Sequence, residues 1–245
     1  MDNDMVAVHK PAGLKMHRDL HDPPQADVLL RRLRVQTGRW IYPIHRLDRP
    51  VSGLVVFAFT PEMARALADQ FRQRNVEKTY LAVTRGYVAP EGLIEAPMTP
   101  NAYAPKAGQV PVVAQTAYKS LATIELNIPV SRYATSRYSL VAIYPRTGRT
   151  HQIRRHFCHI RHPLIGDTTY GDGRHNRFFR THFGCRRLLL AAIELKLHHP
   201  RNGTALHLIA PLEETFQIAL QQLGWHDDFF LPQTHTDGHR QKLDN

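Results

Sequence analysis

One apolar run constrains the fold of this chain more than any other feature. Leu54–Phe59 reads L-V-V-F-A-F, directly follows Gly53, and has the length of a β-strand rather than of a helix. A continuous apolar run of this length is typical of a central strand that is buried on both faces. We therefore expect a sheet that other elements cover on both sides.

The remaining pattern predicts strands and helices along the whole chain. Short apolar or alternating runs predict strands at Met5–His9, Tyr80–Thr84, Ala122–Ile128, Tyr138–Tyr144, Leu188–Leu197 and Leu206–Ile209. Helices are expected around Leu29–Leu33, after Thr60-Pro61, and at Glu213–Leu223. The prolines in 88–116 indicate a long connection. Together these elements predict an α+β fold with a mixed, largely antiparallel sheet flanked by helices and loops.

The length and the cysteine content of the chain indicate its number of domains and its cellular compartment. Its 245 residues suit one large domain, which we expect to span 1–231 and to be followed by a polar, flexible tail at 232–245. No stretch approaches the roughly 20 consecutive apolar residues of a membrane-spanning helix. Cys158 and Cys185 indicate no disulfide framework. A reducing, cytoplasmic location without a membrane is therefore expected.

The charge of the chain narrows the class of partner. The formal net charge is +11 and the sequence pI is about 10.0, which is typical of proteins that bind nucleic acid. An anionic membrane surface is the weaker alternative. The basic residues also cluster, because the segment 146–161 is rich in arginine and histidine and contains no acidic residue.

The densest polar segment, His45–Gly53, lies immediately before the buried strand. Asp48 stands there between Arg46 and Arg49. Two guanidinium groups would offset the cost of partly burying the carboxylate, which makes Asp48 a candidate nucleophile or base. The alternative is a solvated loop in which Asp48 caps a turn.

A second polar segment contains the candidate anion site. Thr150 is placed to cap a helix whose inner face carries Ile153, Phe157 and Ile160. Arg149 would then lie beside the helix N-terminus, which suits a phosphate or a carboxylate such as that of Asp48. A basic, solvated helix face is the alternative. His151, His156, His159 and His162 are not spaced like helical metal ligands and have no acidic residue among them, so no metal site is expected.

These segments, in this order, resemble the signatures of the RluA-type pseudouridine synthases. The matching segments are Lys10–Gly13 (K-P-A-G), His45–Asp48 with Ser52-Gly53, Glu77–Ala82, Gly148–Arg154 and Arg187–Leu190. Further segments, including His156–Asp167 (H-F-C-H-I-R-H-P-L-I-G-D), resemble the tRNA-directed TruC branch, which isomerises uridine 65 in the T stem. Val51 and Ala191 depart from the usual Thr and His, and neither replaces a group expected to do chemistry.

The resemblance implies a site and a reaction. It implies that Asp48 is the essential carboxylate, that Tyr80 lies against the target base and can remove its C5 proton, and that Arg149 pairs with Asp48. Arg46 would enter the duplex where the base leaves. Contacts to RNA are expected from the basic residues Arg46, Arg49, His151, Arg154 and Arg155. The reaction is an isomerisation without a cofactor, and the partner is tRNA, bound by a monomeric catalytic domain without a separate N-terminal RNA-binding domain.

Three other functions stay open at this point. A synthase directed at ribosomal RNA would use the same residues on a different stem-loop. An RNA-binding protein without catalytic activity would share the positive charge but would not need Asp48. A hydrolase that releases free uracil would break the same glycosidic bond without forming a new one.

Overall fold

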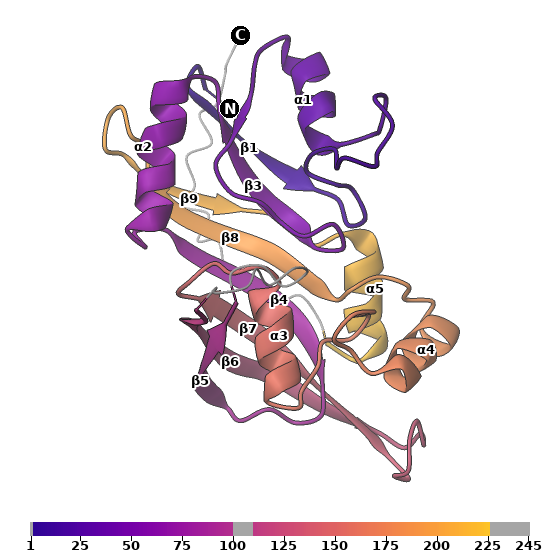
Figure 1. The fold of residues 1–245 in the computed structure, drawn as a ribbon. Coiled ribbons are helices and arrows are strands. Elements are labelled where there is room, and N and C mark those ends of the chain that lie inside the picture. Colours follow the sequence, from indigo (N-terminus) through magenta and orange to yellow (C-terminus); the bar gives the residue numbers. More distant parts are fainter. Residues whose placement is uncertain (1, 100–109, 226–245) are drawn as a thin grey trace, which may run out of the picture.

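The computed structural model describes residues 2–99 and 110–225, and its strands form one sheet (Figure 1). The strands are β1 (Met5–Lys10), β2 (Tyr42–Pro43), β3 (Ser52–Ala58), β4 (Glu77–Arg85), β5 (Glu91–Met98), β6 (Val112–Leu126), β7 (Ser136–Pro145), β8 (Leu190–His198) and β9 (Ala205–Ile209). Their order is β1-β3-β8-β4-β7-β6-β5, with β2 paired to β3 and β9 paired to β8. The β3–β8 pair is parallel and the others are antiparallel. The expected mixed, largely antiparallel sheet is confirmed.

Helices cover both faces of this sheet. They are α1 (Leu29–Thr37), α2 (Pro61–Arg72), α3 (Gln152–His159), α4 (Gly173–His182) and α5 (Glu214–Gln222). Apolar side chains of α1 and α3 share one buried cluster, those of α4 and α5 a second, and those of α2 a third. Figure 1 shows α3 in front of the sheet and α4 to its right, next to α5.

The apolar run at the centre of the chain has the predicted environment. Every residue of β3 is buried. Val55 and Phe57 belong to the cluster under α1 and α3, whereas Leu54 and Val56 belong to the cluster under α2. Because neighbouring side chains of a strand point to opposite faces, a strand between two helical layers must be apolar throughout.

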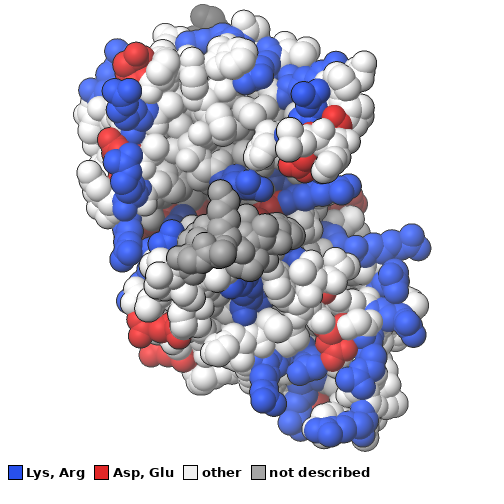
Figure 2. Space-filling model, viewed as in Figure 1, with Lys and Arg blue, Asp and Glu red and all other residues white. Residues whose placement is uncertain are grey.

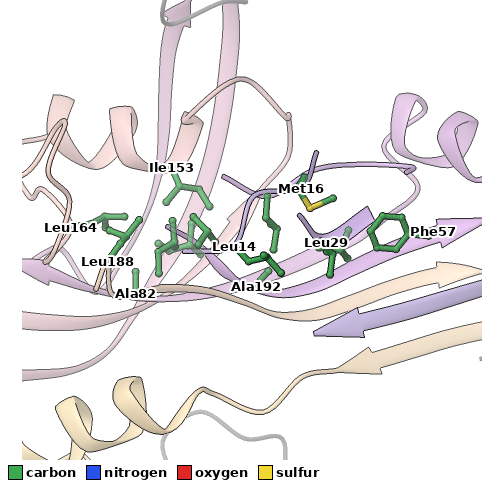
Figure 3. Close-up of a cluster of buried hydrophobic side chains, with 14 of the residues drawn as sticks. Leu14, Met16, Leu29, Phe57, Ala82, Ile153, Leu164, Leu188 and Ala192 are labelled. Atoms are coloured by element: carbon green, nitrogen blue, oxygen red, sulfur yellow. The ribbon is translucent and has the colours of Figure 1, made fainter. Parts of the chain in front are cut away.

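The first cluster also fixes α3, which carries much of the polar motif. Ile153 extends from α3 towards Leu14, Leu164 and Leu188, as Figure 3 shows. Phe157, one helical turn further, is fully buried. Burial of one large apolar side chain stabilises a fold by about 1.5–3 kcal/mol, so these two residues hold the basic helix firmly on the sheet.

The expectation of a long connection at 88–116 is wrong where the structure describes this segment. It contains β5 and the beginning of β6, which pair from Glu91↔Lys119 to Met98↔Val112. Pro97 is tolerated because β5 is the edge strand, where a missing N–H group need not break a ladder. Residues 100–109 of the expected connection lie outside the described residues.

Two further differences concern helices. The expected elements did not include α4, which Asp172 caps by accepting a hydrogen bond from the Arg174 N–H at 2.9 Å. The N-cap of α3 is His151 and not Thr150, so the predicted cap is wrong. The expected tail at 232–245 lies outside the described residues.

Gly53 is required where β3 meets β8. Its φ is +118°, and a Cβ atom there would lie 2.0 Å from the carbonyl oxygen of Ala192. We expect Gly53→Ala to lower the free energy of unfolding by about 3 kcal/mol, because backbone strain and overpacking add. Urea denaturation measures this change. Gly173→Ala has open space around its Cβ and is the control; equal stability of the two variants would contradict the argument.

Candidate active site

A cavity of about 590 Å³ gathers the two polar motifs. Residues 45–48 and 145–154 line it, together with Val51, Leu190 and several residues between 71 and 80. Figure 2 shows Lys and Arg side chains along α2 and across the middle of the face that carries α3. The expected residues Arg46, Asp48, Tyr80, Arg149, His151 and Arg154 all line this cavity. A volume of this size is in the range of small-ligand sites.

Asp48 is the carboxylate of the cavity. It lies in the loop before β3, and its side chain is 20% exposed. One of its oxygens, Oδ2, lies 3.4 Å from Nη1 of Arg154 and 3.5 Å from Nε2 of His151. Two basic groups from the start of α3 therefore face a single carboxylate that remains reachable from the cavity.

The expected pairing of Asp48 with Arg149 is wrong. Among the described residues, Asp48 forms no ion pair with Arg149 or with its sequence neighbours Arg46 and Arg49. The reason is the phase of α3, which begins at Gln152 and so turns Arg154, in its first turn, towards Asp48. Arg149 lines the cavity, and its Nε is buried without a hydrogen-bond partner in the described part of the chain.

Asp167 holds Arg154 in place, and the sequence analysis missed this role. Nε and Nη2 of Arg154 donate to the two oxygens of Asp167, both at 2.8 Å. Burial alone would raise the pKa of Asp167, but the hydrogen bonds from Arg154 and from the N–H groups of Tyr170 and Thr169 outweigh it and hold the pKa below its usual value. A charged, two-point contact fixes the guanidinium plane and leaves Nη1 aimed at Asp48.

His151 has a strained backbone at the entrance to α3. Its φ of +55° is uncommon for a residue other than glycine. Nδ1 of His151 lies 3.0 Å from the hydroxyl of Tyr170, while Nε2 faces Asp48. Burial lowers the pKa of His151, although the charge of Asp48 opposes this shift. Strain of this kind costs about 1–3 kcal/mol and concentrates at functional sites.

Tyr80 enters the cavity from β4. It packs against the apolar cluster under α1 and α3. Burial, and then the charge of Asp48, raise the pKa of the Tyr80 hydroxyl above its usual value. Tyr80 therefore stays protonated at neutral pH.

Lys10 fixes the loop that carries Asp48. Its side chain is fully buried, and Nζ donates to the carbonyl oxygens of Pro11 and Leu14 at 2.9 Å and of Arg49 at 3.1 Å. The N–H of Gly13 also donates to the Arg49 carbonyl, at 2.8 Å. Lys10–Gly13 and the loop that carries Asp48 therefore form one hydrogen-bonded unit.

The two other arginines expected to contact RNA lie outside the cavity lining. Nε of Arg49 donates to the Gly13 carbonyl at 3.0 Å, and Nη1 of Arg155 donates to the Thr99 carbonyl at 3.3 Å. Arg49 remains exposed.

Metal-ligating side chains converge away from the cavity. Among the described residues, the oxygens and nitrogen of Asp2, Asp4 and His199 lie within 4.8 Å of one another. Arg201 already forms a two-point ion pair with Asp4. Nothing else at this cluster points to a cation, and none of its members lines the cavity.

His45 has a structural role at the edge of the cavity, which predicts a pH dependence. It stacks on Phe71 with ring centroids 4.7 Å apart, and Nε2 accepts the N–H of Val56 at 3.1 Å. Burial, and then the charge of Lys78, lower the pKa of His45 to about 3. An unfolded chain binds this proton near its ordinary pKa of about 6.5. Between these values the unfolded state holds more protons, so stability falls as the pH drops.

We therefore expect His45→Gln to be less sensitive to acid than the wild type. Near pH 5 the unfolded wild-type chain binds about one proton more than the folded protein. Its free energy of unfolding should therefore fall more steeply than that of the variant, by ~1.4 kcal/mol per pH unit. Urea unfolding at pH 7, 6 and 5 measures both slopes. Parallel slopes would show that His45 titrates normally in the folded protein.

The fold and the site define an RNA pseudouridylate synthase. The sequence profile of that family, "RNA pseudouridylate synthase", matches residues 4–159. The chain belongs to this family of RNA-modifying isomerases, and the class predicted from the motifs is confirmed.

Individual relatives agree with this assignment. The chain is 43% identical to "tRNA pseudouridine synthase C" of Haemophilus ducreyi, over 94% of this chain and 96% of that protein. It is 45% identical to the protein of the same name from Pectobacterium carotovorum over 91% of this chain, and spans 61% of that longer relative. A solved structure, "Human RNA Pseudouridylate Synthase Domain Containing 1", superposes with a TM-score of 0.67 at 26% identity and covers 89% of this chain and 85% of that one.

Proposed function

We propose that this chain converts a uridine of tRNA, uridine 65 in the T stem, into pseudouridine, with Asp48 as the essential group. The observation that carries this proposal is the Asp48 side chain at the wall of a cavity rich in basic residues, with Nη1 of Arg154 at 3.4 Å. The name shared by the relatives supports tRNA as the substrate. We further propose that the protein acts as a monomer in the cytoplasm.

The chemistry needs one carboxylate and no oxidant. Pseudouridine forms when the N1–C1′ bond breaks, the uracil turns, and C5 bonds to C1′. C5 then loses a proton while N1 gains one, so product and substrate are isomers. Asp48 acts at C1′, C2′ or uracil C6, and Arg154 keeps the carboxylate oriented. No cofactor is required.

The target uridine must leave the stem to reach Asp48. Extrusion costs a few kcal/mol of lost pairing and stacking. Arg46 is exposed and lines the cavity, so its planar cation is placed to fill the gap in the duplex. Tyr80 packs against the extruded base. Because its hydroxyl is protonated at neutral pH, Tyr80 can take the C5 proton only if its own proton passes to another group at the same time. We propose Asp48 as that acceptor, because its charge acts on Tyr80.

Contacts to the RNA backbone offset the cost of extrusion. Arg149 is suited to a phosphate, because it lines the cavity and its buried Nε has no hydrogen-bond partner among the described residues. Arg49 is an exposed cation beside the Asp48 loop. Arg155, which is half-buried, extends the basic edge along α3, whereas His151 is buried and faces Asp48. These contacts supply affinity more than sequence information.

The experiment that tests this function is incubation of the purified protein with an unmodified tRNA transcript, followed by mapping of pseudouridine at each position. We expect one new pseudouridine at position 65. Formation on ribosomal RNA fragments alone would favour the rRNA-directed alternative, and release of free uracil would indicate a hydrolase. Binding without any product would indicate a protein that only binds RNA.

A further inference from the structure

The helix α4 carries a ridge of positive charge that the proposed reaction does not use. Arg174, Arg177 and Arg180 follow at intervals of three residues, and all three are exposed. Side chains three apart on a helix are neighbours, so these arginines form one row. Six residues of helix rise by about 9 Å, which is the axial length of two to three nucleotides of one strand.

The local acidic group does not neutralise this ridge. Asp172 is already bound by Nη1 of Arg85 at 2.6 Å and also caps the helix, while Arg174 lies 3.6 Å from it. Arg177 and Arg180 form no ion pair within 2–99 and 110–225. The ridge therefore presents positive charge to solvent.

The charge pattern works against the stability of the helix itself. Arg174 lies in the first turn, where the helix dipole favours acidic side chains. Like charges three residues apart also repel one another. A polyanion bound along the ridge relieves both effects, whereas an uncharged partner relieves neither.

The opposite face of α4 makes the ridge rigid. Phe179 is fully buried, with its ring centroid 4.9 Å from that of Tyr138 and 5.0 Å from that of Phe183. Asn176 accepts the N–H of Gly166 and donates to the Asp167 carbonyl, both at 2.7 Å. The ridge is thus fixed to the loop whose Asp167 holds Arg154 at the cavity.

The apolar face of α4 packs on the opposite side of the sheet from α3, but Arg85 joins its N-cap residue Asp172 to the end of α3. Figure 1 shows α4 to the right of α3, and Figure 2 shows Lys and Arg side chains over that part of the molecule. Nη2 of Arg85 also donates to the carbonyl of the exposed Arg161 at 3.3 Å, directly after α3. Basic residues therefore continue from α3 to α4.

We propose that Arg174, Arg177 and Arg180 bind the phosphate backbone of the RNA outside the cavity, on the stem that flanks the extruded uridine. This inference rests on the proposed function, because it takes tRNA as the polyanion. Regularly spaced cations on a rigid helix suit a sugar–phosphate backbone, and they add affinity without touching the reacting base.

The test compares two variants with the same change in charge. Arg174→Gln/Arg177→Gln/Arg180→Gln removes the ridge and keeps good helix formers. The control, Arg18→Gln/Arg31→Gln/Arg32→Gln, removes three exposed cations on and before α1, at the other end of the sheet. Binding of unmodified tRNA transcript is measured over a range of salt, and pseudouridine formation is measured at saturating tRNA.

We expect the ridge variant to raise Kd for tRNA at least about tenfold and to reduce the salt slope of log Kd by about 2–3, with kcat within twofold of the wild type. The control should change the slope by less than one. Equal Kd and slope in the two variants would overturn the proposal, as would a fall in kcat with unchanged Kd. If the triple variant does not fold, Arg177→Gln alone should reduce the slope by about 0.7–0.9, and an unchanged slope would again overturn it. A wild type without synthase activity on tRNA would instead contradict the proposed function.

Discussion

Asp48→Asn is expected to abolish pseudouridine formation, with kcat reduced by about 10⁴-fold or more, as when an essential nucleophile is removed. The amide has nearly the shape of the carboxylate but lacks its charge. Binding of tRNA should stay within about threefold of the wild type, because Asp48 supplies chemistry rather than backbone contacts. Single-turnover assays on a tRNA transcript and a binding titration measure the two effects separately.

The stability of this variant is the internal control. Asp48 is partly exposed, and its contacts to Arg154 and His151 are long, at 3.4 and 3.5 Å. Loss of such contacts costs about 1 kcal/mol or less. Asp172→Asn removes an ion pair of another aspartate outside the cavity and should keep full activity. A normal rate with Asp48→Asn would show that another group performs the chemistry.

The parts of the site that could be predicted from sequence are those set by neighbouring residues. The buried strand β3 is a contiguous apolar run, and the loop that carries Asp48 directly precedes it. One stretch of sequence therefore predicts both the strand and the carboxylate. The amphipathic helix α3 follows from Ile153 and Phe157 on one face. Each of these predictions depends on a local pattern.

The parts that could not be predicted depend on tertiary contacts. Whether Arg149 or Arg154 faces Asp48 depends on the residue at which α3 begins, and a shift of one residue rotates a helix by about 100°. The role of Asp167 requires the loop after α3 to fold back over Arg154. The edge position of β5, which makes Pro97 acceptable in a strand, follows only from the strand order.

Arg154→Gln is expected to lower kcat by about 10²–10³-fold, the usual effect of losing one preorganised charged group in an active site. Gln cannot span Asp48 and Asp167 together. Arg149→Gln is the comparison, because Arg149 lies in the same cavity without contacting Asp48. It should raise KM with a smaller effect on kcat. The reverse result, with kcat lost only in Arg149→Gln, would restore Arg149 as the partner of Asp48.

Arg154→Gln should also destabilise the protein, because it removes the partner of Asp167. A second substitution, at Asp167, can separate this loss of stability from the loss of catalysis. Asp167 is 1% exposed and would be left as a buried, unpaired carboxylate, at a cost of about 3–5 kcal/mol. Asp167→Asn in the same chain removes that charge. We expect the double variant to recover most of the free energy of unfolding and none of the kcat.

The double variant distinguishes two roles of Arg154, support of the fold and orientation of Asp48. If Arg154 only supported the fold, activity would return together with stability in the double variant. If Arg154 orients Asp48, stability returns alone, because among the described residues only the imidazole of His151 then faces the carboxylate. Urea denaturation and single-turnover rates on the same preparations decide between these outcomes.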